Sequence, residues 1–341
     1  MKAVGLIRYL PIEHPESLMD LELPKPKAAG RDLLVKIHAI AVNPVDTKIR
    51  KAKANVEVEP KVLGWDAAGE VLETGADVTL FNVGDLVYYA GDVTRSGCNA
   101  EYQLIDERIV GHKPQSLSFE AAAALPLTSV TAWESLFDRL GIAEDAVKSR
   151  DKSILIIGGA GGVGSIAIQL ASKVAGLQVI ATASRPETIQ WVKALGANHV
   201  ISHRQDLVAQ MHALAIPQVD YILCANDTDA HFKAMAELIK PQGKICSIVE
   251  TERPVDLGLL KAKSATFVWE MMFTRSMFKT ADMLEQHHIL ERITKLIDHG
   301  TLKTTVNEIK MPINAANLRA AHAQLESGTT IGKIVLSGWD Y

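Results

Sequence analysis

The segment 153–171 (SILIIGGAGGVGSIAIQLA) constrains the fold of this chain most strongly, because an apolar run, a glycine-rich turn and an apolar-periodic helix follow one another directly. The aliphatic residues 154–157 are typical of a buried parallel strand. The glycines after them have the G-x-G-x-x-G spacing, which suits a tight turn, close approach of a pyrophosphate and helix–strand packing. The amino end of the next helix attracts the same anion. The predicted dinucleotide contacts are Gly159, Gly161, Gly162, Val163 and Gly164, with a purely structural turn as the alternative.

Composition narrows the class of protein. The 341 residues are 48% hydrophobic and 22% charged, which is ordinary for a globular chain long enough for two domains. The formal net charge of −4 argues against nucleic acid as a partner. No apolar stretch is long enough to cross a membrane, and the first ten residues resemble a strand more than a signal peptide, so we expect a cytoplasmic protein with no membrane partner.

The distribution of strand and helix patterns predicts two domains. Residues before about 125 contain short β-rich runs bounded by Gly, Pro, Asn and Asp. Strand and helix patterns then alternate, which indicates βαβ units and a parallel sheet. We expect a β-rich domain formed by 1–125 and 266–341, with a dinucleotide-binding domain of 126–265 inserted into it. The run 244–249 is a candidate edge strand for pairing two copies.

Several motifs in this order resemble the medium-chain dehydrogenase/reductase superfamily over nearly the whole chain. They are NPVDTKIR (43–50), GWDAAGEV (64–71), VGDLVYYAG (83–91), AEYQ (100–103), LPLTSVTAWESL (125–136), the glycine loop, FVWEMMFTRSMFKTADMLEQHHIL (267–290) and GKIVL (332–336). Within the superfamily the chain is similar to the zinc-free quinone oxidoreductases and the zinc-type alcohol dehydrogenase-like proteins. The resemblance implies an α/β Rossmann domain with a doubly wound parallel sheet, a β-rich GroES-like catalytic domain and a homodimer.

The resemblance also bears on the metal. Zinc-dependent members place a Cys and a His where this chain has Asn43 and Trp65. Because zinc takes Cys, His, Asp or Glu, we expect none. His287 and His288 are adjacent on a predicted helix and are expected at its solvated surface.

Without a Lewis acid, the chemistry that remains feasible is hydride delivery to quinones or α,β-unsaturated carbonyls. The alternatives are a zinc-dependent alcohol dehydrogenase with unrecognised ligands and a catalytically weak NADPH-binding or sensor protein.

Candidate site residues each have a structural alternative. The resemblance suggests catalytic roles for Asn43, Asp46 and Thr128, although Asn43 also suits a turn before Pro44, and Asp46 and Thr128 suit helix caps. Asp66 is expected to order its loop. The substrate-binding candidates, which also fit a hydrophobic core, are Tyr89, Trp269 and Phe273.

The cofactor choice is argued from the end of the second parallel strand. NAD-specific folds place a carboxylate there, whereas this chain has Ser184 and Arg185, which suit a 2′-phosphate. We therefore expect NADPH. By resemblance His203 lies near the adenosine phosphate, and Lys333 is predicted to reach it. Further candidates for cofactor contact are Cys224, Ile248 and Phe267; Cys224 and Cys246 are expected to be buried thiols, and Cys98 an accessible one.

Overall fold

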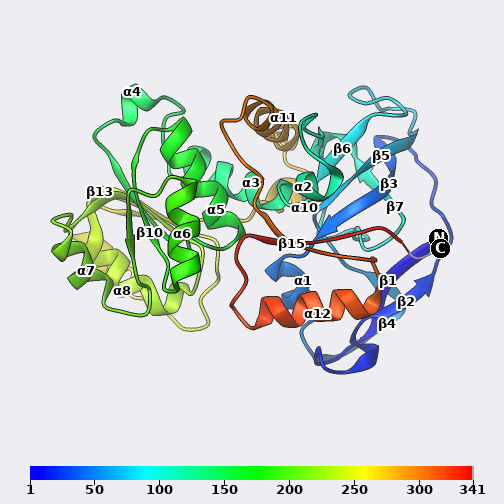
Figure 1. Ribbon diagram of the computed structural model, residues 1–341, viewed down its shortest axis with the longest axis horizontal. Coiled ribbons are helices and arrows are strands. Elements are labelled where there is room, and N and C mark those ends of the chain that lie inside the picture. The colour runs from blue at the N-terminus through cyan, green and yellow to red at the C-terminus, as the bar shows by residue number, and fades with distance from the viewer. Residues whose placement is uncertain (340–341) are drawn as a thin grey trace. The chain divides into compact units, whose positions relative to one another are not determined.

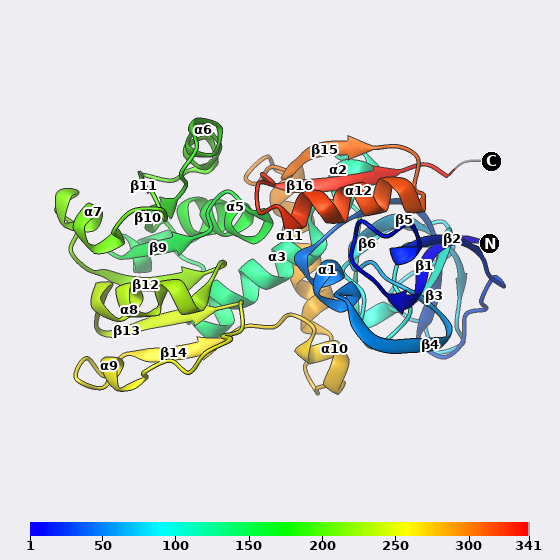
Figure 2. The same ribbon diagram turned by 90° about the horizontal axis from the view of Figure 1, so that it is seen from below.

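Six parallel strands form the sheet of one structural unit, in the order β11-β10-β9-β12-β13-β14 (Figure 2). The order is that of the doubly wound dinucleotide-binding fold, so the α/β prediction is confirmed. The strands are β9 (Ser153–Ile157), β10 (Gln178–Thr182), β11 (His199–Ile201), β12 (Val219–Cys224), β13 (Ile239–Ser247) and β14 (Thr266–Trp269). The helical segments are α3 (Pro126–Trp133), η3 (Glu134–Arg139), α4 (Ala146–Ser149), α5 (Gly162–Gln169), η4 (Leu170–Val174), α6 (Pro186–Leu195), α7 (Leu207–Ala213), α8 (Thr228–Leu238) and α9 (Gly258–Lys261).

Local sequence explains why these elements begin and end where they do. All five residues of β9 are buried, as expected for a central strand covered on both faces. Helix α6 begins at Pro186, where the missing N–H costs nothing, and ends before Gly196, whose φ of 120° suits glycine. Helix α8 is capped by the Asp227 carboxylate, which accepts from Ala230 N.

The other unit is β-rich and contains two sheets. One has the order β15-β16-β3-β5-β6-β8, with β7 paired to β3, and the other has the order β2-β1-β4. Figure 1 labels β3, β5, β6 and β7 of the first sheet and β1, β2 and β4 of the second. The strands are β1 (Lys2–Tyr9), β2 (Met19–Glu22), β3 (Asp32–Ala41), β4 (Lys53–Val62), β5 (Ala67–Thr74), β6 (Leu86–Tyr89), β7 (Tyr102–Asp106), β8 (Val110–His112), β15 (Val306–Lys310) and β16 (Lys333–Ser337). The helical segments are η1 (Pro15–Ser17), α1 (Pro44–Arg50), η2 (Glu107–Ile109), α2 (Phe119–Ala123), α10 (Thr274–Phe278), α11 (Glu285–Asp298) and α12 (Ala315–Glu326).

The structure describes residues 1–339, and the chain changes from one unit to the other twice. The β-rich unit comprises 1–127 and 273–339, and the parallel-sheet unit comprises Thr128–Met272. The sequence prediction assigned 266–272 to the β-rich domain. In the structure, β14 pairs with β13 through Lys244↔Thr266 to Ser247↔Trp269, so this segment belongs to the parallel sheet. Among residues 1–339, no helix is long and apolar enough to span a membrane.

Candidate functional site

The glycine loop after β9 is shaped by backbone contacts that exclude side chains. Gly158 makes the turn, with a φ of 85°, and a Cβ added to Gly159 would lie 3.0 Å from Ala181 Cβ. A Cβ on Gly164 would overlap Gly158 O and come within 2.7 Å of Gly159 Cα, because helix and loop touch there. The predicted packing role of Gly164 is therefore present. The tight-turn role belongs to Gly158, one residue before the position we predicted.

Gly161 differs from its neighbours because the space beside it is open. It precedes α5 with extended backbone, and an added Cβ would meet only Gly158 O, at 3.5 Å. Gly162 and Val163 form the first turn of α5 and are partly exposed. The unpaired N–H groups and positive dipole end of α5 are thus accessible to an anion such as a pyrophosphate.

The loop lies where the strand order reverses, between β9 and β12. Ligands of doubly wound sheets bind outside the carboxyl ends of the strands at this reversal. A Cβ added to Gly158 would lie 3.2 Å from Cβ of Asn226, which follows β12. The cofactor candidate Cys224 is the last residue of β12 and is buried, and its thiol donates to Asn226 O at 3.0 Å. Another candidate, Ile248, donates its backbone N–H to Cys224 O. Phe267 packs its ring against Phe232, at 5.7 Å between centroids, which gives it a core role.

Positive and imidazole side chains follow the carboxyl ends of the next strands. Ser184 follows β10, and its hydroxyl lies 3.5 Å from His203 Nε2 beyond β11. Arg185 pairs with Glu187 at 3.2 Å, so part of its charge is offset. Burial is the largest cause that lowers the pKa of His203, and His231, Arg204 and Arg185 lower it further. The structure thus brings together Ser184, Arg185 and His203, three predicted contacts of the 2′-phosphate.

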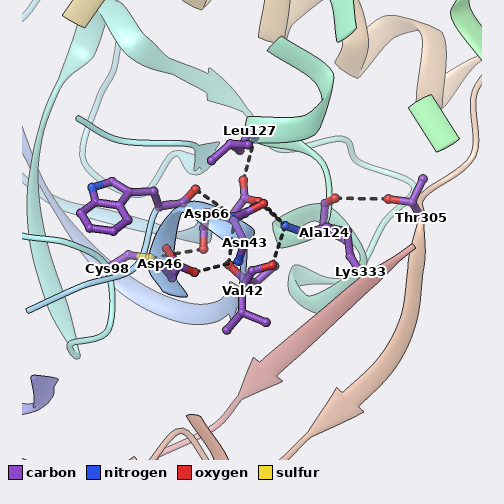
Figure 3. Close-up of polar contacts among 11 residues, drawn as sticks. Val42, Asn43, Asp46, Asp66, Cys98, Ala124, Leu127, Thr305 and Lys333 are labelled. Atoms are coloured by element: carbon purple, nitrogen blue, oxygen red, sulfur yellow. Dashed lines mark hydrogen bonds and ion pairs between the residues drawn. The ribbon is translucent and has the colours of Figure 1, made fainter. Parts of the chain in front are cut away.

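A buried polar cluster in the β-rich unit joins residues from three distant segments (Figure 3). The ammonium of Lys333, on β16, donates to Asp66 Oδ2 and Val42 O, at 2.8 and 2.9 Å, and to Asn43 Oδ1. Asn43 Nδ2 donates to Asp66 Oδ2 at 2.9 Å. Asp66 Oδ1 accepts from Leu127 N at 2.7 Å and so holds the start of α3, a segment distant in the sequence from the loop that Asp66 was expected to order. We call Asn43, Asp66 and Lys333 the lysine cluster.

The lysine cluster changes the role assigned to two residues. We predicted that Lys333 reaches the 2′-phosphate, but its side chain is 3% exposed and its three N–H bonds are directed to three buried oxygens. The structure therefore assigns Lys333 to this cluster instead. The side-chain amide of Asn43, for which we predicted a catalytic role, already binds Lys333 and Asp66. Asn43 also precedes Pro44 at the start of α1, as its structural alternative required.

Asp46 lies beside the lysine cluster as a buried carboxyl with one engaged oxygen. Its Oδ2 accepts from Asn43 N at 2.7 Å, a helix-capping contact, while Oδ1 has no hydrogen-bond partner within residues 1–339. The pKa of Asp46 is raised to about 7; burial is the largest cause, Asn43 N–H and Lys333 act in the opposite direction, and Asp66 contributes to the rise. Asp46 can therefore hold a proton near neutral pH.

The side chains at and around Asn43 and Trp65 do not suit a zinc ion as ligands. The Trp65 indole is 1% exposed and donates to Asp92 O at 3.1 Å, and an indole N–H has no lone pair for a metal. The Asn43 oxygen accepts from Lys333, whose positive charge would repel a cation. Cys98, expected to be accessible, is 1% exposed; its thiol donates to Asp66 O at 3.3 Å, and burial raises its pKa. In the part of the chain that the structure describes, no group of three or more His, Cys, Asp or Glu is arranged to hold a metal ion.

The remaining candidates lie on different elements. Thr128 is the third residue of α3 and is buried. Tyr89 is fully buried on β6, and its hydroxyl has no hydrogen-bond partner among residues 1–339. Phe273 packs edge-on against Trp65, with centroids 6.4 Å apart. Trp269 is 47% exposed at the end of β14 and contacts Phe267.

One expectation about the histidines of α11 is wrong. His288 is exposed and pairs with Glu285 at 3.1 Å, as expected for a solvated helix face. His287 is buried instead, with Nδ1 2.6 Å from Val110 O and its ring edge-on to Phe81. The face of α11 that packs on β8 determines this difference, and an adjacent His-His pair gives no sign of which member faces inward.

Two residues were missed or undervalued by sequence reasoning. Asp66 binds both Lys333 and Asn43, and the carboxylate directly after Trp65 in GWDAAGEV was the available signal. His231, near the amino end of α8, interacts with His203 and is mostly buried. No sequence spacing links these two histidines, because they lie on different βα units.

Comparison with known proteins identifies both parts of the chain. The family model described as "Alcohol dehydrogenase GroES-like domain" matches residues 29–115, and the one described as "Zinc-binding dehydrogenase" matches 195–336. A "Zinc-type alcohol dehydrogenase-like protein" of Staphylococcus aureus (strain MSSA476) is 45% identical over 337 residues, 99% of this chain and all of that protein.

More distant matches have more specific names. The "2-methylene-furan-3-one reductase" of Solanum lycopersicum is 30% identical over 314 residues, which cover 89% of this chain and 71% of that protein. The solved structure of Escherichia coli quinone oxidoreductase complexed with NADPH superposes with a TM-score of 0.82 at 25% identity, covering 99% of this chain and 100% of that one.

Proposed function

The chain belongs to the medium-chain dehydrogenase/reductase superfamily of NAD(P)-dependent oxidoreductases, in the quinone oxidoreductase-like branch, and from this premise we propose that it is a zinc-independent, NADPH-dependent reductase of quinones or other α,β-unsaturated carbonyls. Bound NADPH supplies the hydride. The names of two matches, a quinone oxidoreductase with NADPH and a reductase of a methylene-furanone, belong to this reaction class and support the proposal.

The observation that carries the proposal is the lysine cluster. Where zinc-dependent relatives have metal ligands, this chain has an amide and an indole that already bind Lys333 and Asp92 O. The Lys333 ammonium forms an ion pair with Asp66, whose Oδ2 also accepts from the Asn43 side-chain amide. With no Lewis acid to stabilise an alkoxide, alcohol oxidation is disfavoured. Reduction of a conjugated double bond needs only a positioned hydride and hydrogen-bond donors for the carbonyl.

The cofactor preference rests on the carboxyl ends of β10 and β11. Ser184, Arg185 and His203 gather there, and each can donate to phosphate oxygens. The nearby Glu187 is ion-paired to Arg185, so part of its charge is offset. These contacts favour a ribose 2′-phosphate over the free hydroxyl of NADH.

For the chemistry itself we propose that Asp46 holds the proton that follows the hydride. Its unpartnered oxygen and raised pKa suit a carboxyl that is partly protonated at neutral pH. Asn43 keeps Asp46 in place through its backbone N–H and joins it to the lysine cluster. Roles for Thr128, Tyr89, Trp269 and Phe273 as contacts of the nicotinamide or substrate remain predictions.

We also propose a homodimer that pairs two parallel sheets edge to edge. The candidate strand 244–249 lies inside the sheet, because β14 covers β13, so β14 is the outer strand available for pairing. Trp269 and Met271, at the end of β14, are 47% and 49% exposed. Light scattering on purified protein is expected to give the mass of two chains, and a single-chain mass would overturn the dimer.

Spectrophotometric turnover tests the function directly. Purified protein is mixed with NADPH and either menadione or cyclohexenone, and separately with NADP⁺ and a simple primary alcohol. The same mixtures with NADH or NAD⁺ serve as matched controls. We expect NADPH consumption with the quinone or the enone and none with the alcohol. Alcohol oxidation would support a zinc-type dehydrogenase instead, and tight NADPH binding without any consumption would support a sensor.

A further inference from the structure

The carboxyl ends of β10 and β11 gather more ionisable groups than a phosphate site of fixed charge needs. His203 is surrounded by Arg185, Arg204 and His231, all of which disfavour its protonation. His231 in turn has Asp227 nearby, which favours protonation, but burial dominates and lowers its pKa. Glu187 pairs with Arg185 at 3.2 Å. The partly buried His203 thus has two arginines and a mostly buried histidine, His231, near it.

The His203 imidazole has little to stabilise it in the free protein. Its Nδ1 is buried without a hydrogen-bond partner in the described part of the chain, and its Nε2 has only Ser184 Oγ at 3.5 Å. Buried polar atoms without partners are costly unless a ligand or proton satisfies them. A doubly negative ligand placed among these cations would change the balance, because it would attract the proton that the neighbouring charges repel.

We propose that His203 and His231 form a histidine pair that takes up one proton when a ribose 2′-phosphate binds beside Ser184 and Arg185. His203 contacts the phosphate, and His231 is a positioning residue that sets when His203 becomes charged. The inference deepens the proposed NADPH preference and rests on it. The affinity for NADPH then depends on pH, whereas the affinity for NADH, which lacks the phosphate, does not.

The direction of proton transfer separates this site from one built of arginines alone. A phosphate monoester has a second pKa of about 6, so binding to fixed cations makes it release any proton it carries. Binding to neutral histidines does the opposite, because the complex holds a proton that the free protein did not. Uptake of one proton makes the affinity rise by up to about tenfold for each unit that the pH falls.

Calorimetry on the full chain tests the pair. The probe is 2′,5′-ADP, compared with 5′-AMP, in buffers of different ionisation enthalpy at pH 6.5, 7 and 8. We expect net proton uptake with 2′,5′-ADP and none with 5′-AMP. H203Q is expected to abolish the uptake and weaken 2′,5′-ADP binding, and H231Q to shift the midpoint of the affinity–pH curve upward. The matched control is H199Q, at the opposite end of β11, where His199 lies 3.3 Å from Gln178; it should change neither.

Titration of the imidazole NMR signals of the wild-type chain, with and without 2′,5′-ADP, gives the same information without a variant. The ligand is expected to raise the pKa of His203. Tight 2′,5′-ADP binding with no proton uptake, or with proton release, would overturn the proposed histidine pair. So would an affinity–pH curve of H231Q that matches the curve of H199Q. If 2′,5′-ADP binds no better than 5′-AMP at any pH, the NADPH preference itself fails, which is a different outcome.

Discussion

The loop after β9 and the lysine cluster both concentrate polar groups in little space, but they are built in opposite ways. The loop uses backbone N–H groups from consecutive residues, and side chains are excluded where Gly159 and Gly164 pack. The cluster uses side chains from positions 43, 66 and 333 and is closed to solvent. The loop is therefore suited to receive a charged ligand, whereas the cluster already contains its own cation.

The difference predicts where each region is sensitive to substitution. The loop should respond to added volume, and the cluster should respond to lost charge. The following experiments try to break this comparison, in order of expected effect.

Lys333→Met should cause the largest loss. Removing the ammonium leaves Asp66 and Asn43 buried without their cation, which costs about 3–5 kcal/mol of the free energy of unfolding. Chemical denaturation measures this loss in the free energy of unfolding. The double variant with Asp66→Asn should recover part of the loss, since no buried carboxylate is then left unpaired. A loss below about 1 kcal/mol in the single variant would mean that the cluster is not closed as described.

Gly164→Ala should destabilise the parallel-sheet unit by about 1–3 kcal/mol, because the new methyl group overlaps Gly158 O and crowds Gly159. Gly161→Ala is the matched control, since its methyl group has open space. The control should keep the melting temperature of the wild type and lose NADPH affinity, as the methyl group occupies the approach of the phosphate. Equal stability of the two variants would contradict the packing described for the loop.

Arg185→Glu should weaken NADPH binding by about tenfold to a hundredfold through loss of a charge-assisted contact, and leave NADH binding nearly unchanged. Arg150→Glu makes the same change in charge at the amino ends of the strands, just before β9, and should leave both affinities as they are. Fluorescence titration with each cofactor measures the effect. Equal losses for NADPH and NADH would remove the 2′-phosphate assignment.

The smallest effect concerns pH and a buried histidine, His322, that belongs to neither region. Burial, and then Arg50, lower the pKa of His322 to about 3, so the native state stays neutral where the unfolded chain binds a proton. The free energy of unfolding therefore decreases as pH falls below about 6.5, by up to about 1.4 kcal/mol per pH unit. His322→Gln should flatten the unfolding free energy between pH 6.5 and 5, whereas the exposed His288→Gln should not. Parallel curves for wild type and His322→Gln would contradict this.

What the sequence could predict follows the same division. The glycine loop and the division into an α/β part and a β-rich part depend on local patterns. The start of α2 does too, since the Ser118 hydroxyl accepts from Ala121 N as its N-cap. Lys333 was assigned to a phosphate because its partners lie 290 and 267 residues away along the chain. Cys98 was expected to be accessible because its neighbours are polar, whereas the loop folds back so that Cys98 N donates to Gly64 O.

The shifted turn residue has a similar cause. Spacing places the motif on Gly159, but only the backbone shows that Gly158 has the positive φ. Strand β14 was missed because four residues between loops carry little periodicity, and its pairing with β13 is a tertiary property.

The central claim is that this chain reduces its substrate without a metal, since Asn43, which stands in place of a zinc-binding Cys, already binds Lys333. The most direct measurement is NADPH-dependent menadione reduction before and after prolonged dialysis against a zinc chelator, with the zinc content of the same samples. We predict unchanged turnover and far less than one zinc per chain in both. One zinc per chain, with turnover lost on its removal and restored on its return, would contradict the account.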